Sequence, residues 1–284
     1  MDVEPSDLEA PARAVKPRPA HGVGLVRALA TLLIGFVLAQ LFGKLAAELA
    51  RAVTHVDTSA LTGAVVVPSM LASESALVLV AIAAPLTLSL PPMATLGLLA
   101  PAPVRVFLAA ALGTVMLGPL GDQLMTWFSA AFPSLTLGVV PTLHDLAQSL
   151  PLVWLWPAFA LLPGLGEELL FRGVLQRSIA CPRLAVVISG VAFALFHVDP
   201  VHVMGVLPLG LFLAWVAQRS STAVTVVAHV INNSVALASI RSGDLDVGFG
   251  SERALPPAWL AASILIFAAA AVVVAHETRL RSRS

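Results

Sequence analysis

Long apolar runs restrict the fold of this chain more than any other feature of its sequence. A helix needs about 20 predominantly apolar residues to cross a bilayer, and the chain offers repeated runs of roughly that length. We place eight predicted spans at residues 23–42, 71–90, 104–124, 152–174, 184–198, 201–217, 222–240 and 256–275. The second run could start earlier, because residues 61–70 are also apolar. We therefore predict an all-α polytopic membrane protein, a bundle of about eight transmembrane helices.

The composition excludes a soluble domain. Hydrophobic residues make up 58% of the chain and charged residues only 11%, with a mean hydropathy of +0.93, whereas about a quarter of the residues in a soluble domain are charged. The net charge of zero gives no indication of a nucleic-acid partner, so the lipid bilayer is the expected surrounding. The single cysteine, Cys181, excludes an internal disulfide framework.

The distribution of basic residues predicts the orientation, because cytoplasmic loops collect Lys and Arg. With eight spans and a cytoplasmic N-terminus, twelve of the sixteen basic residues lie inside. The inside set is Arg13, Lys16, Arg18, Arg27, Arg105, Arg172, Arg177, Arg183, Arg219, Arg279, Arg281 and Arg283, which leaves Lys44, Arg51, Arg241 and Arg253 outside. We expect both termini in the cytoplasm of a multi-pass protein, in the cell membrane of a bacterium.

The chain divides into four predicted parts. Residues 1–22, rich in Pro, Ala and charge, form a disordered cytoplasmic tail that is not a cleavable signal peptide, because it starts with acidic residues. Residues 23–151 hold the N-terminal transmembrane helices, and residues 152–240 form a core that carries the polar motifs described below. Residues 241–284 contain the last transmembrane helix and a basic cytoplasmic tail.

Charge interrupts the fourth apolar run at Glu167, Glu168 and Arg172. An ionised carboxylate without a partner is costly in such a place, so a chain that keeps two of them is expected to use them. On a helix Glu168 and Arg172 are i and i+4 and share a face, while Glu167 points about 100° away from Glu168. We expect Arg172 to neutralise Glu168, which is the usual structural reading of such a pair, and Glu167 to face another part of the bundle.

Two later spans carry the remaining polar groups. Phe193 precedes His197 by four residues near the end of the fifth run, and His229 precedes Asn233 by four inside the seventh. Polar groups from three spans can converge only in the interior of the bundle. A carboxylate, two imidazoles and an amide are what hydrolysis at a carbonyl requires: a base for water, a group that positions the water, and donors to the oxyanion.

These three motifs, Glu-Glu-x-x-x-Arg, Phe-x-x-x-His and His-x-x-x-Asn, resemble those of the CAAX-protease and bacteriocin-processing family, also called the abortive-infection family, of intramembrane glutamate endopeptidases. The resemblance covers residues 152–240. It implies an eight-helix bundle in which Glu167 activates water together with His197, and His229 with Asn233 binds the oxyanion. Glu168, Arg172 and Phe193 would support them. No cofactor and no metal are expected, and the substrate would be a peptide or a membrane protein.

Other readings of the same residues stay open. Taken singly, His197 could be an interfacial residue, and His229 with Asn233 a hydrogen bond between packed helices. Asn232 would replace Asn233 if the helix were rotated, and His202 and Asp199 could hold His197 or line an entrance.

Cys181, Ser189 and Ser234 lack the signature of a nucleophile. The alternatives to a glutamate protease are a zinc protease that uses Glu167, His197 and His229, a non-catalytic scaffold or immunity protein, and a carrier with a proton relay.

Overall fold

The computed structural model describes residues 22–55, 62–135, 145–146, 148–242 and 255–281, and within these residues it contains helices and no strands. The long helices are α1 (Leu25–Thr54), α2 (Gly63–Leu86), α4 (Val104–Ala131), α9 (Pro200–Arg219), α10 (Thr222–Ser242) and α11 (Pro257–Arg281). These six are long and apolar enough to cross a membrane. The prediction of an all-α polytopic bundle is confirmed, and the chain is an integral membrane protein. The predicted disordered tail lies almost wholly outside the described residues.

The other two predicted spans have less regular counterparts. Residues 184–198 correspond to α8 (Pro182–Leu195), which has only 14 residues. Residues 152–174 correspond to a continuous run of short segments, in which two π-helical stretches interrupt the α-helix. The segments are α6 (Leu152–Trp156), η2 (Pro157–Leu161), α7 (Leu162–Glu168), η3 (Leu169–Leu175) and η4 (Gln176–Ser178).

Proline gives a physical reason for the first π-helical stretch. In a regular α-helix the ring of Pro163 would clash with the carbonyl group four residues earlier, which belongs to Phe159 in η2. The wider π-helical turn relieves this clash, and such turns are frequent at functional sites. The irregular run therefore delivers α7, with both glutamates at its end, into the middle of the bundle.

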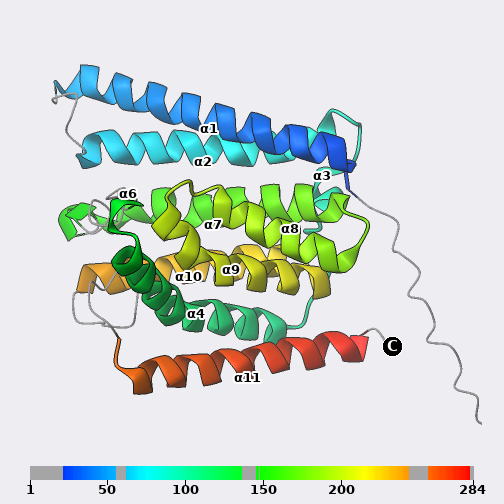
Figure 1. The fold of residues 1–284 in the computed structure, drawn as a ribbon. Helices are drawn as coiled ribbons and strands as arrows, with labels where there is room; N and C mark the ends of the chain where they lie inside the picture. Colours follow the sequence, from blue (N-terminus) through cyan, green and yellow to red (C-terminus); the bar gives the residue numbers. More distant parts are fainter. Residues whose placement is uncertain (1–21, 56–61, 136–144, 147, 243–254, 282–284) are drawn as a thin grey trace, which may run out of the picture.

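Helices α1 and α2 pack as an antiparallel pair along one side of the molecule (Figure 1). The buried face of α1 consists of small residues at intervals of three or four: Ala28, Thr31, Gly35, Ala39, Gly43 and Ala47. Small side chains let two helices approach closely, which is how transmembrane helices associate without a hydrophobic driving force. The large side chains of α1, such as Leu33 and Leu45, point outward, as expected for contact with lipid.

The irregular run lies between two groups of helices (Figure 1). Its α7 and η3 segments contact α2 on one side and α10 on the other, and α8 also packs against η3. Beyond α10, helix α4 packs against α9, α10 and α11. The charged residues of α7 and η3 are therefore surrounded by protein and are kept away from lipid.

Candidate active site

A fully buried ion pair joins α7 to η3. Nη1 of Arg172 donates to Oε1 of Glu168 over 2.7 Å, and neither side chain has any exposed surface. Arg172 also donates from Nη2 to the carbonyl oxygen of Gly210 in α9 at 2.9 Å. Its guanidinium group lies 4.4 Å from the ring centroid of Phe193 in α8. The predicted pairing of Glu168 with Arg172 is present, and Arg172 also connects η3 to α8 and α9.

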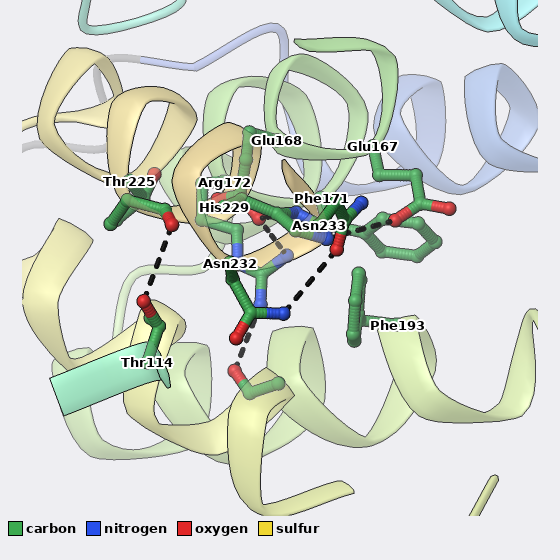
Figure 2. Close-up of polar contacts among 12 residues, drawn as sticks. Thr114, Glu167, Glu168, Phe171, Arg172, Phe193, Thr225, His229, Asn232 and Asn233 are labelled. Carbon is green, nitrogen blue, oxygen red and sulfur yellow. Dashed lines mark hydrogen bonds and ion pairs between the residues drawn. The ribbon is translucent and has the colours of Figure 1, made fainter. Parts of the chain in front are cut away.

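His229 of α10 lies between the two glutamates (Figure 2). Its Nδ1 is 3.1 Å from Oε1 of Glu168, and its Nε2 is 3.8 Å from Oε2 of Glu167. The three residues are buried, with exposed fractions of 3% for His229, 8% for Glu167 and 0% for Glu168. Both carboxylates therefore flank the same imidazole ring, while Glu168 in addition pairs with Arg172.

His197 approaches this cluster through Phe193. Its Nδ1 lies 3.0 Å from the carbonyl oxygen of Phe193, and its ring is 5.1 Å from the Phe193 ring, centroid to centroid. The Phe193 ring in turn lies 5.6 Å from that of His229, edge to face. A carbonyl oxygen only accepts, so this hydrogen bond requires a proton on Nδ1 of His197. The Phe193 ring thus lies between His197 and His229.

A tight turn fixes His197 after α8. Val198 has a positive φ of 63°, and the amide of Asp199 donates to the carbonyl oxygen of His197 at 2.7 Å. The side chain of Asp199 then accepts from the backbone nitrogens of Val201 and His202, which caps the N-terminus of α9. The ring of His202 lies 4.6 Å from that of His197. Both residues therefore help to hold His197 in place, as one reading of the sequence proposed.

The two asparagines of α10 lie beside each other at the edge of the cluster (Figure 2). Nδ2 of Asn232 donates to Oδ1 of Asn233 at 3.3 Å. Asn232 is buried with 7% of its surface exposed, and Asn233 is half-buried. With its oxygen engaged in this way, Asn233 retains its own NH₂ group for another acceptor.

Two glycines of α7 allow the neighbouring helices to come close enough for these contacts. A Cβ atom on Gly164 would lie 2.6 Å from Cγ2 and 2.9 Å from the backbone nitrogen of Val230 in α10. A Cβ atom on Gly166 would lie 3.2 Å from the backbone oxygen of Glu74 in α2. The absence of side chains at these two positions brings α10 and α2 against the part of α7 that carries the glutamates.

Glu74 is a residue that the sequence analysis missed. It lies midway along α2 with 7% of its surface exposed, where α2 packs against Gly166 of α7. A lone acidic residue inside the apolar run 71–90 was the signal that could have found it.

The three residues considered as alternative nucleophiles lie in a turn or donate hydrogen bonds to the backbone. Cys181 is exposed in the turn before α8. The hydroxyl groups of Ser189 and Ser234 donate to the carbonyl oxygens of Phe171 and Val230, respectively. Within the part of the chain that the structure describes, no group of three or more His, Cys, Asp or Glu side chains is arranged to hold a metal ion.

Comparison with known families gives one match. Residues 149–235 of the 284 match the family described as Type II CAAX prenyl endopeptidase Rce1-like. The match confirms the resemblance inferred from the three motifs, and it covers Glu167, Glu168, Arg172, Phe193, His197, His229 and Asn233 but not Glu74. No curated protein and no solved structure matches the chain. The family indicates a CAAX-type intramembrane protease, and therefore a hydrolase.

Proposed function

We propose, from this resemblance and from the buried cluster, that the chain is an intramembrane endopeptidase that hydrolyses a peptide bond with water activated by Glu167. The substrate is a peptide or a membrane protein that enters from the bilayer, and both termini of the enzyme lie in the cytoplasm. The observation that carries the proposal is the contact of one buried imidazole with two carboxylates, 3.1 Å from Glu168 and 3.8 Å from Glu167.

Glu167 is the general base in this scheme. Glu168 is occupied by Arg172 and by Nδ1 of His229, whereas Glu167 has one weaker contact, with Nε2 of His229. Glu167 is thus the carboxylate free to accept a proton from water and to return it to the leaving amine. Glu168 and Arg172 position His229.

His197 holds the attacking water. Because its Nδ1–H donates to the carbonyl oxygen of Phe193, its Nε2 can accept a hydrogen bond from the water molecule that Glu167 deprotonates. A base and an acceptor acting on the two protons of one water fix the direction of the oxygen lone pair, which is the positioning that hydrolysis needs.

His229 and Asn233 bind the oxyanion. Nδ1 of His229 donates to Glu168, so Nε2 can donate to an oxyanion only when the ring carries both protons. Such an imidazolium ion balances the cluster, since Glu167 and Glu168 then face two cations, His229 and Arg172. Asn233 adds its NH₂ group, because its oxygen is already engaged by Asn232.

The test compares newly formed peptide termini in membranes of cells that produce the wild-type protein, Glu167→Gln or Glu277→Gln. Glu167→Gln removes the proton acceptor and keeps the shape. Glu277→Gln is the matched control, because this carboxylate pairs with Arg105 far from the cluster. We expect termini that appear with the wild type and the control but not with Glu167→Gln, at equal protein levels in the membrane. Identical termini in all three would remove Glu167 as the base.

A further inference from the structure

Helix α2 brings a third carboxyl group to the cluster. Glu74 is surrounded by protein, with only 7% of its surface exposed, and its Oε2 has no hydrogen-bond partner among the described residues. A buried polar atom without a partner is uncommon in a folded protein and calls for an explanation. In the scheme proposed above, Glu74 has no role.

The packing of α2 against α7 places Glu74 beside Glu167. The backbone oxygen of Glu74 lies 3.2 Å from the position that a Cβ atom on Gly166 would occupy, and Leu77 of α2 packs at the same distance. Glu167 follows Gly166 directly in sequence and is buried like Glu74, with 8% of its surface exposed. Glu74 therefore lies at the contact of α2 with the turn of α7 that carries Glu167.

The number of nearby cations limits how many of the three carboxyl groups, Glu74, Glu167 and Glu168, can be ionised. At most two cations face Glu167 and Glu168: Arg172, and His229 when its ring carries both protons, with contacts of 2.7 to 3.8 Å. Among the described residues of the adjacent helix α1, Arg27 and Lys44 are exposed and Arg51 pairs with Glu48, so α1 offers no cation to a third ionised carboxylate. An unbalanced charge within a transmembrane bundle is costly, and two neighbouring carboxyl groups avoid that cost by sharing one proton.

We propose that Glu74 is a positioning residue that keeps this proton and donates a hydrogen bond to the Glu167 carboxylate. The bond holds one oxygen of Glu167 and leaves the other directed toward water. Its consequence for turnover rests on the proposed role of Glu167, but the shared proton itself does not.

The shared proton is tested on the purified protein by infrared spectroscopy, which needs no substrate. A protonated carboxylic acid has a C=O stretching band that is distinct from the bands of carboxylates and amides. We expect this band to disappear in both Glu74→Gln and Glu74→Leu, to shift in Glu167→Gln, and to remain unchanged in the control Glu277→Gln. A band unaffected by either substitution at Glu74 would overturn the proposal.

The positioning role is tested by the rate at which the wild-type-specific termini appear in cells. Gln retains a donor to Glu167, so Glu74→Gln should stay close to the wild-type rate. Leu has a similar volume and no donor, so Glu74→Leu should lower the rate about 10- to 100-fold, the loss expected for one hydrogen bond to a charged group. Equal rates for Leu and Gln, with equal amounts of folded protein, would contradict the role. If the wild type itself forms no termini, the proposed protease function fails, and the infrared result alone decides the inference.

Discussion

Breaking the buried pair of Glu168 and Arg172 provides the sharpest test of how this bundle holds its charges. Arg172→Met replaces the guanidinium group by an apolar side chain of similar length. The change leaves the Glu168 carboxylate without the 2.7 Å contact, removes the 2.9 Å hydrogen bond to the Gly210 carbonyl, and takes the cation from the Phe193 ring. Loss of one partner of a buried pair costs about 3 to 5 kcal/mol of unfolding free energy.

The double variant separates the charge from the packing. Glu168→Gln alone should cost about 1.5 to 3 kcal/mol, because Arg172 loses a charged acceptor but keeps the carbonyl oxygen of Gly210. In Glu168→Gln/Arg172→Met no buried charge of the pair is left unpaired, and the amide oxygen of Gln can still accept from His229. We therefore expect the double variant to lose about 2 kcal/mol less than the sum of the single variants.

The measurement is reversible unfolding of the purified protein in mixed micelles, followed by the fluorescence of its five tryptophans. The control is the same cycle on Arg105 and Glu277, which lie 3.5 Å apart with the Arg105 side chain 79% exposed. That cycle should give a coupling of about 0.5 kcal/mol at most. If the losses of unfolding free energy in the two single variants sum to that of the double variant within about 0.5 kcal/mol, the buried pairing is refuted.

Four further outcomes are expected. Gly164→Ala should lower stability by about 1 to 3 kcal/mol and reduce turnover, because its Cβ would lie 2.9 Å from the backbone nitrogen of Val230; thermal unfolding and terminal-peptide yields measure both effects. Asn233→Ala should lower turnover about 10²- to 10³-fold with little change in substrate binding, and Asn232→Ala should lower it less. Activity of the purified protein should survive exhaustive chelation. Loss of activity on chelation, restored only by stoichiometric zinc, would reassign the cluster as a metal site. Reporter fusions should place both termini in the cytoplasm, whereas an external C-terminus would exclude the eight-span arrangement.

Hydropathy located the helices well because lipid imposes one simple requirement on length and polarity. Each of the eight predicted runs overlaps a described helix or, at residues 152–174, a continuous helical run. The ends differ more: α1 continues to Thr54 and α2 begins at Gly63, since helices extend beyond the most apolar part of their sequence. The π-helical segments could not be read from apolar content, because they depend on local backbone hydrogen bonding and on Pro163.

The sequence indicated most residues of the candidate site and one contact between them, but not the contacts that depend on helix packing. The i, i+4 spacing indicated the contact of Glu168 with Arg172, since residues four apart share a helix face. Glu74 stands out in the sequence only as a lone acidic residue in an apolar run, and no local spacing relates it to Glu167, which lies far along the chain. The packing of α2 against α7 brings Glu74 close to the turn of α7 that carries Glu167.

The spacing of Gly164, Glu167 and Glu168 explains why both carboxylates reach one histidine. These residues are i, i+3 and i+4 in α7, so all three lie on one side of the helix even though the two glutamates diverge by about 100°. Gly164 admits α10 at Val230, the residue after His229, and the imidazole then projects over the next turn with one nitrogen toward each carboxylate. Gly166 lies about 100° from Glu167 on its other side and admits α2. Glu167 therefore lies beside His229 on the turn of α7 that also contacts α2, whereas Glu168 is enclosed with Arg172. Glu167 and Glu168 have different surroundings because Gly164 and Gly166, which lack side chains, admit different helices.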